Sequence, residues 1–416
     1  MSATKPFNIP KALVWRAYKL VKANQGSAGV DEQSLAAFEH KLKDNLYKIW
    51  NRMCSGSYMP PPVKAVPIPK KSGGVRILGV PTVADRIAQT VVKLVFEPQV
   101  ESEFLPDSYG YRAGKSALDA IGVTRERCRR WDWVLEFDIV GLFDNIPQDL
   151  LLEAVRKHTN TKWVELYIER WLRAPMEYPD GRVEKRDRGT PQGGVISPVL
   201  ANLFLHYAFD AWMARTHANN PWCRYADDGL VHCVSESEAV AIRASLQRRF
   251  AECGLEMHPQ KTQIVYCKDD RRKGEYPRIQ FDFLGYTFRP RVVCLSQPTR
   301  FLVSFNPAVS KASLKSMRAH VRRSCIRNRT ELKLEDIARG FNPTLRGWLQ
   351  YYGHYRRSEM YPVLRHFNLT LVAWAIAKYK RLRRRKRRAG QWLLELSKRD
   401  PGLFAHWRVG MVGSFI

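Results

Sequence analysis

Residues 222–234 contain the pentapeptide Tyr225-Ala226-Asp227-Asp228-Gly229 between two short runs of apolar residues. An Asp-Gly pair between alternating apolar residues predicts a β-hairpin, so we expect two short strands joined by a tight turn. The carboxylates of Asp227 and Asp228 would then both lie at that turn. Taken alone, however, Asp-Asp-Gly is more typical of a solvated turn than of a functional site.

A third aspartate lies upstream, in Trp133-Val134-Leu135-Glu136-Phe137-Asp138-Ile139. The aromatic and branched residues of this segment predict a strand with Asp138 near its end. An isolated aspartate in such a place commonly caps a turn or helix. Asp138, Asp227 and Asp228 together could instead hold two Mg²⁺ ions, because Mg²⁺ needs few carboxylates and takes its other ligands from water and phosphate. Two such ions can activate a hydroxyl and neutralise a phosphoryl group during its transfer.

Two further segments lie upstream of the pentapeptide. Residues 59–78 are rich in proline and reach the turn signal Lys71-Ser72-Gly73-Gly74, which predicts a hairpin flanked by Lys70 and Arg76. Positive side chains there could bind a triphosphate, although solvated surface charge explains them as well. The second segment is the glycine-rich stretch that runs from Arg188 to Gly194 and predicts a turn.

The remaining periodicity predicts an α+β region followed by helices alone. We expect a strand pair near Thr262–Tyr266 and Phe281–Phe288, and a helical, strongly basic region from about Ser310. Helices are expected at about 11–53, 85–95, 148–173, 197–212 and 236–252.

The chain has 416 residues, with 69 Lys and Arg against 40 Asp and Glu, a formal net charge of +29. Such a charge favours a polyanionic partner, either nucleic acid or an acidic membrane surface. A run of about 18 apolar residues is missing, and Met1 to Pro10 does not look like a secretion signal, so we expect a cytoplasmic protein. The eight cysteines show no zinc-ligand spacing, which predicts packed, reduced thiols.

Positive charge is densest near the carboxyl end, where nine of the eleven residues from Lys378 to Arg388 are basic. Aromatic residues precede this run at Trp348, Tyr351, Tyr352 and Tyr355. Phosphates would bind the basic side chains, and unpaired bases can stack on aromatic rings, a combination that suits RNA. A solvated tail beside a buried aromatic cluster is the alternative. It does not explain why nine like charges occur together without acidic partners.

These segments, in this order, resemble the polymerase core of reverse transcriptases. The stretch from Arg188 to Pro198 resembles the form found in group II intron proteins, and the region from Gly347 onward resembles their thumb and maturase domain. The resemblance implies fingers and a palm with an antiparallel sheet at 1–305, including an amino-terminal extension at about 1–60. A helical thumb and maturase domain at 306–375 and a basic nucleic-acid-binding segment at 376–416 follow.

The resemblance also implies roles for individual residues. Asp138, Asp227 and Asp228, with the backbone carbonyl of Ile139, would bind two Mg²⁺ ions, for which Mn²⁺ could substitute. Phe143 matches the position that excludes a ribose 2′-hydroxyl. The nucleotide would lie among Lys70, Arg76, Ile139, Val140, Phe143, Gln192 and Lys261, while Phe283-Leu284-Gly285-Tyr286 would support the primer end.

The implied partners are deoxynucleoside triphosphates, an RNA template, a DNA primer, target DNA and the group II intron RNA in a ribonucleoprotein. Only a few residues follow Trp407, so the chain resembles the compact group IIC class, which lacks an endonuclease. The expected function is to copy intron RNA into DNA and to promote splicing and intron mobility. A splicing factor without polymerase activity and a reverse transcriptase serving DNA repair or defence remain alternatives, and a dimer is compatible with the sequence.

Overall fold

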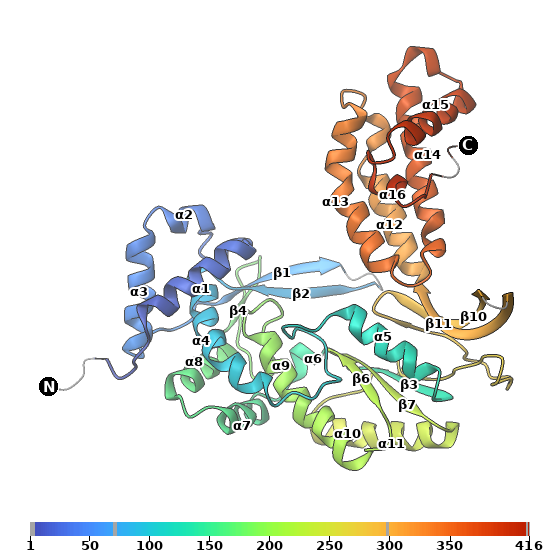
Figure 1. Cartoon of the computed structure of the whole chain (residues 1–416). Helices are drawn as coiled ribbons and strands as arrows, with labels where there is room; N and C mark the ends of the chain where they lie inside the picture. Colours follow the sequence, from blue (N-terminus) through green and yellow to red (C-terminus); the bar gives the residue numbers. More distant parts are fainter. Residues whose placement is uncertain (1–4, 70–72, 297–298, 413–414, 416) are drawn as a thin grey trace. The chain divides into compact units, whose positions relative to one another are not determined.

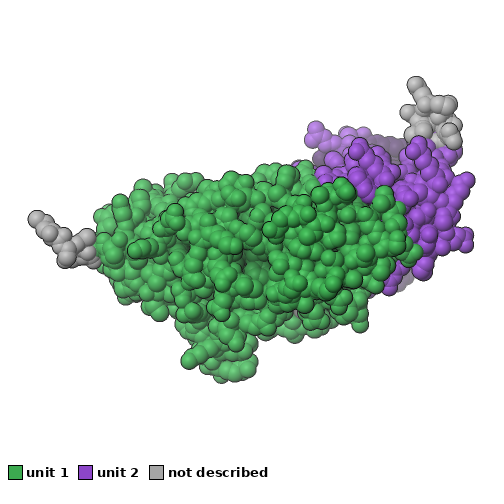
Figure 2. All heavy atoms as spheres, turned by 90° about the horizontal axis from the view of Figure 1, so that it is seen from below, with its two compact units in different colours: residues 1–120, 135–264 green, residues 121–134, 265–416 purple. Residues whose placement is uncertain are grey.

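The computed structural model describes residues 5–69, 73–296, 299–412 and 415, and the chain folds into two compact units. Unit 1 comprises residues 1–120 and 135–264, and unit 2 comprises residues 121–134 and 265–416 (Figure 2). The chain therefore leaves unit 1 once, for a short segment, before it returns and finally passes into unit 2. Among the described residues, no helix is long and apolar enough to cross a membrane.

Unit 1 begins with helices on one side of α4 (Val83–Glu101) (Figure 1). Helix α1 (Lys11–Asn24) and helix α3 (Leu42–Cys54) both pack on α4, and the short α2 (Leu35–Glu39) precedes α3. The predicted helical amino-terminal region is therefore confirmed. Helix α4 extends beyond the predicted range at both ends. Its start at Val83 is fixed by the side chain of Thr82, which caps the first turn and accepts the amide of Asp85.

The predicted hairpin consists of β1 (Val63–Pro69) and β2 (Val75–Val80), with Pro69 paired to Val75. The sheet continues through β4 (Met176–Glu177) to β5 (Val183–Glu184) in the order β2-β1-β4-β5. The pairs β1–β2 and β4–β5 are antiparallel, whereas β1–β4 is parallel, a departure from the expected antiparallel sheet. Lys70 and the first two turn residues lie outside the described residues.

The second sheet has the order β6-β7-β3-β8. Its strands are β3 (Trp133–Asp138), β6 (Trp222–Tyr225), β7 (Asp228–Cys233) and β8 (Gln263–Tyr266). The helices between β3 and β8 in the chain are α6 (Leu142–Asn145), α7 (Gln148–His158), α8 (Lys162–Arg173), α9 (Ser197–Leu205), the π-helical turn η1 (His206–Asp210), α10 (Ala211–Thr216) and α11 (Glu236–Glu252). The helix expected at 148–173 is thus two helices, and the one expected at 197–212 contains a π-helical turn.

Unit 2 contains a three-stranded sheet with the order β11-β10-β9. Its strands are β9 (Phe281–Phe283), β10 (Tyr286–Ser296) and β11 (Thr299–Val309). The prediction that the segments near 262–266 and 281–288 pair with each other is wrong, because β8 pairs with β3 and β9 pairs with β10. Leu284 and Gly285 have positive φ values of 51° and 81° and form the tight turn between β9 and β10.

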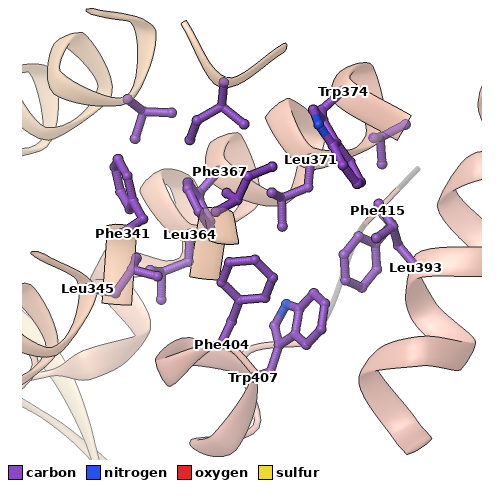
Figure 3. Close-up of a cluster of buried hydrophobic side chains, with 14 of the residues drawn as sticks. Phe341, Leu345, Leu364, Phe367, Leu371, Trp374, Leu393, Phe404, Trp407 and Phe415 are labelled. Atoms are coloured by element: carbon purple, nitrogen blue, oxygen red, sulfur yellow. The ribbon is translucent and has the colours of Figure 1, made fainter. Parts of the chain in front are cut away.

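Helices follow from Ser310, as predicted: its side chain accepts the amide of Ser313 and caps the first of them. Helix α5 (Ala117–Cys128), earlier in the chain, lies mostly in this unit. The helices after Ser310 are α12 (Lys311–Arg323), η2 (Ile326–Asn328), α13 (Leu334–Tyr352), η3 (Arg357–Met360), α14 (Tyr361–Lys378), η4 (Lys380–Leu382), α15 (Lys386–Arg399) and α16 (Ala405–Arg408). Their apolar side chains, including Phe341, Phe367 and Trp407, form a common core (Figure 3). The buried aromatic residues near the carboxyl end thus belong to this core.

Candidate active site

The turn that carries Asp227 is formed by Ala226 and Asp227, because Tyr225 and Asp228 are the last paired residues of β6 and β7. Ala226 has φ of 56°, the left-handed conformation that such a turn requires. The predicted hairpin is confirmed, but the prediction that Asp228-Gly229 forms its turn is wrong. Gly229 lies within β7, where it pairs with Arg224.

Gly229 has a packing role that the sequence pattern did not reveal. A Cβ atom at this position would lie 2.1 Å from the ring of Phe137 on the neighbouring strand β3. The Phe137 ring is almost completely buried and also contacts Phe209 and Phe250. Glycine is therefore required because an aromatic ring covers the backbone of β7, one residue beyond Asp228.

Asp138 is the last residue of β3, as predicted. The chain continues as an antiparallel bridge between Ile139 and Met257, in which Val140 donates to the Glu256 carbonyl at 2.9 Å and His258 donates to the Asp138 carbonyl at 2.8 Å. In such a pair the hydrogen bonds come from the flanking residues, so the carbonyl of Ile139 points away from Met257.

The three carboxylates repel one another. The pKa of Asp228 is raised to about 7, first by enclosure within the protein, although its side chain still reaches solvent, and then by the negative charges of Asp227 and Asp138. The pKa of Asp227 is also raised, mainly by burial and also by Asp138, whereas the positive charges of Arg76 and Lys261 lower it. Cations are therefore stabilised at this site.

One such cation belongs to the chain: the ammonium group of Lys261 forms an ion pair with Asp138. The Asp138 side chain is 12% exposed, whereas that of Lys261 is 56% exposed. In the part of the chain that the structure describes, no three His, Cys, Asp or Glu side chains converge closely enough to hold a metal ion as they stand. The ligand types nevertheless suit Mg²⁺, which prefers carboxylate and carbonyl oxygens, and the repulsion among the carboxylates favours a divalent cation.

Arg224, on β6, is hydrogen-bonded to the β6–β7 turn and was not among the predicted site residues. Its side chain is fully buried, and all five of its N–H groups donate hydrogen bonds. The acceptors are Asp210 Oδ1 (2.7 Å), Asp210 Oδ2 (2.6 Å), Ser108 Oγ (2.7 Å), Asn202 Oδ1 (3.1 Å) and the carbonyl of Ala226 (3.1 Å). A charged residue inside an otherwise apolar predicted strand was the signal that could have identified it.

The glycine-rich segment connects the hairpin β1–β2 to helix α6. Thr190 donates to the Phe143 carbonyl at 2.7 Å, and Gly79 donates to the Gln192 carbonyl at 2.8 Å. A Cβ atom at Gly189 would lie 2.4 Å from the carbonyl oxygen of Phe143, so only glycine permits this approach. The Gln192 side chain donates to Asp144 at 3.0 Å. The structure thus brings Phe143 and Gln192 to the same side of unit 1.

Buried polar side chains of helix α4 hold the backbone directly after the glycine-rich segment. Gln89 accepts the backbone amides of Val195 and Ile196 and donates to Asp85 at 2.9 Å. Asp85 is fully buried and also accepts hydrogen bonds from Tyr58 and Trp171, and burial raises its pKa to about 6. Sequence reasoning missed both Asp85 and Gln89, which lie four residues apart on one face of α4.

Residues 68–288 match the family described as reverse transcriptase (RNA-dependent DNA polymerase). Residues 314–392 match the group II intron, maturase-specific domain. The first match covers the predicted carboxylates, the glycine-rich segment and part of the hairpin, and the second covers most of the helices of unit 2.

Relatives with sequence similarity include protein YkfC of Escherichia coli, which is 29% identical over 280 residues, covering 58% of this chain and 73% of the relative. The group II intron-encoded protein LtrA of Lactococcus lactis is 32% identical over 194 residues, or 46% of this chain and 32% of the relative. The putative COX1/OXI3 intron 1 protein of Saccharomyces cerevisiae is 28% identical over 197 residues. The similarity thus spans about a third of LtrA and 23% of the yeast protein.

Proposed function

Because the chain belongs to the reverse transcriptase (RNA-dependent DNA polymerase) family and carries a group II intron maturase-specific domain, we propose that it extends a DNA primer along an RNA template. The observation that carries this proposal is the placement of Asp138, Asp227 and Asp228. They come from the end of β3, the β6–β7 turn and the start of β7, and they interact electrostatically. A divalent cation would relieve their repulsion.

In this proposal Asp138, Asp227, Asp228 and the Ile139 carbonyl hold two Mg²⁺ ions, with Mn²⁺ as a substitute. When bound, the ions would activate the primer hydroxyl and neutralise charge on the transferred phosphoryl group. Lys261 gives up its contact with Asp138 and remains nearby as a positive charge for the phosphates of the nucleotide. The two ions would offset the negative charge of the three carboxylates more completely than the single ammonium group of Lys261 does.

The deoxynucleoside triphosphate would be held by residues on several elements. Arg76, on β2, lies close enough to Asp227 to lower its pKa, so its guanidinium can contact a triphosphate bound beside the metals. Lys70 would act from the same hairpin. Gln192 and Val140 line the pocket, and Phe143, half-buried on α6, excludes a ribose 2′-hydroxyl.

The maturase part of the proposal concerns intron RNA. Here 1–305 would form the fingers and palm, 306–375 the thumb and maturase domain, and 376–416 the basic RNA-binding segment. Binding of the folded intron would favour splicing by mass action. Within the ribonucleoprotein, the intron RNA would cut target DNA by reverse splicing and the protein would copy the inserted RNA, as in the group IIC class.

The test of the polymerase is Mg²⁺-dependent extension of a DNA primer on an RNA template. Asp227→Asn removes one charge at nearly constant shape and should abolish extension. Asp149→Asn removes an exposed carboxylate at the start of α7 and should leave extension unchanged. Equal activity in the Asp227→Asn variant would contradict the assigned site.

A second candidate function, splicing without polymerisation, is favoured by the match of residues 314–392 to the maturase-specific domain. It predicts that the wild-type protein promotes splicing of its intron RNA and that Asp227→Asn splices equally well. If the folded wild-type protein extended no primer on RNA, this second function would replace the first. Use in DNA repair or defence would be indicated by extension without any effect on intron splicing.

A further inference from the structure

Tyr111 is exposed to 53% and has φ of 59°, a left-handed conformation that bulky residues rarely adopt. Backbone strain of this kind persists only where the surrounding structure imposes it, and the segment around Tyr111 does so. Two sets of contacts hold it, one on each side of the residue. The position of the Tyr111 ring is therefore determined by the fold rather than by a free loop.

The first set of contacts connects the residues before Tyr111 to β6 and its turn. Tyr109 donates to the Arg224 carbonyl at 2.8 Å, and Arg224 donates from its amide to the Asp107 carbonyl at 3.0 Å. The carbonyl of Gly110 accepts a hydrogen bond from Asn202 at 2.7 Å. A Cβ atom at Gly110 would lie 2.4 Å from the amide nitrogen of Ala226, so the backbone here lies directly against the turn that carries Asp227.

The second set of contacts comes from Arg112, the next residue along the chain. Its Nε donates to Glu101 at 2.8 Å, and one Nη donates to the carbonyls of Leu105 and Ser108 at 2.7 and 2.8 Å. Arg112 thereby ties residues 105–108 to the end of α4. With Gly110 and Arg112 both fixed, the direction of the intervening side chain is fixed as well.

The Tyr111 ring meets Phe143 edge to face, with ring centroids 6.3 Å apart and an interplanar angle of 85°. This is a favourable geometry for an aromatic pair. Phe143 lies on α6, a helix of only four residues, and is half-buried. A side chain on so short an element depends on its neighbours for its orientation.

We propose that Tyr111 is a specificity-determining positioning residue: its edge-to-face contact holds the Phe143 ring where that ring excludes nucleotides with a 2′-hydroxyl. This role rests on the proposed function, in which Phe143 contacts the sugar of the incoming nucleotide. Tyr111 itself acts through Phe143 and touches no reacting atom. Without Tyr111, the Phe143 ring rotates more freely and a ribonucleotide fits more often.

The test compares kcat/KM for one deoxynucleoside triphosphate and its ribonucleotide counterpart on the same primed RNA template. Tyr111→Asn removes the ring and keeps a residue that tolerates positive φ, so altered discrimination reflects the lost contact and not new backbone strain. We expect the ratio of the two kcat/KM values to fall about three- to tenfold, the size of one aromatic pair, mainly through a lower KM for the ribonucleotide. Tyr111→Phe should restore the wild-type ratio.

Two further variants separate the possible outcomes. Tyr47→Asn removes a comparably exposed ring on α3 and should leave the ratio unchanged. In a Phe143→Ala background, Tyr111→Asn should lower the ratio no further. Thermal unfolding shows whether each variant is folded, and Tyr111→His, which retains an aromatic ring, substitutes if Tyr111→Asn does not fold. Tyr111→His should retain the wild-type ratio of the two kcat/KM values.

A wild-type ratio in folded Tyr111→Asn, together with a reduced ratio in Phe143→Ala, would overturn the role of Tyr111 alone. Loss of the wild-type ratio in folded Tyr111→His would also overturn it. Failure of the wild-type protein to extend any primer would overturn the proposed function and this role with it.

Discussion

Arg224 and Asp210 form a fully buried ion pair joined by two hydrogen bonds, Nε to Oδ1 at 2.7 Å and Nη2 to Oδ2 at 2.6 Å. Asp210 is the last residue of the π-helical turn η1. Arg224 also donates to the carbonyl of Ala226, next to Asp227. The pair therefore connects η1 to the β6–β7 turn, which carries Asp227 and directly precedes Asp228.

Arg224→Lys should lower both stability and polymerase activity. Lysine keeps the charge but lacks the planar fork, so Asp210 and Ala226 cannot both be satisfied. Each buried acceptor left without a donor costs about 1–3 kcal/mol, which urea unfolding monitored by circular dichroism would measure. Arg156→Lys, at an exposed ion pair on α7, is the matched control and should change stability by less than about 1 kcal/mol. Equal stability of both variants would contradict the anchoring role.

The raised pKa of Asp228 predicts a pH-dependent requirement for Mg²⁺. Below about pH 7 Asp228 binds a proton, and Mg²⁺ must displace it. The Mg²⁺ concentration for half-maximal primer extension should therefore rise as the pH falls from 8 to 6, by up to about tenfold per unit. The KM for the primer, measured at saturating Mg²⁺, serves as the control. A Mg²⁺ requirement independent of pH would contradict the assignment.

The same shift predicts a stability difference without divalent ions. A carboxyl group whose pKa is higher in the folded state stabilises the protein at low pH, and this contribution is lost as the pH rises through the folded-state pKa. The wild-type protein should thus lose stability between about pH 4 and pH 7, relative to Asp228→Asn. Thermal unfolding of both proteins across this range measures the difference, which should be constant above pH 8. If the wild-type protein instead gained stability relative to Asp228→Asn as the pH rose from 4 to 7, the prediction would be contradicted.

Gly229→Ala should destabilise unit 1 by about 1–3 kcal/mol, the usual cost of overpacking a core. The added methyl group would overlap the Phe137 ring, which is confined by Phe209 and Phe250. Combining Gly229→Ala with Phe137→Leu should cost less than the sum of the single changes, because the smaller side chain makes room. Strict additivity in urea unfolding would show that the two residues do not interact.

Neutralising Arg383, Arg384, Arg385, Lys386, Arg387 and Arg388 to Gln should weaken RNA binding and flatten its salt dependence. These side chains are exposed; Lys386, Arg387 and Arg388 form the start of α15, and the other three directly precede it. Each lost phosphate contact lowers the slope of log K against log salt by about 0.7–0.9. Titration of RNA at several salt concentrations measures this slope, with Glu395→Gln as a control that leaves it unchanged. An unaltered slope in the six-residue variant would exclude this run from the RNA interface.

Much of the fold could be predicted because its signals are local. Ser310 and Ser235 cap the helices that follow them, so the starts of α12 and α11 depend on side chains within a few residues. The apolar alternation around Asp138 and Asp227 likewise predicted the strands that carry them. The order of these motifs along the chain was sufficient to indicate the family.

The remaining features depend on residues that are distant in sequence. The turn lies at Ala226-Asp227 instead of Asp228-Gly229, and Gly229 lies within β7, against the ring of Phe137 on another strand. Likewise β8 pairs with β3 at the edge of the second sheet, whereas β9 pairs with β10 in a different sheet. Neither the pairing of Arg224 with Asp210 nor the contact of Tyr111 with Phe143 has a local signal.

The sequence alone therefore determined the type and order of most helices and strands and indicated the three candidate carboxylates, because backbone preferences and apolar periodicity act over a few residues. Only the tertiary structure decided which strands pair, which glycine forms a turn, and which buried or aromatic side chains hold the candidate site. These features depend on packing and buried hydrogen bonds between distant segments, whose geometry exists only once the chain has folded.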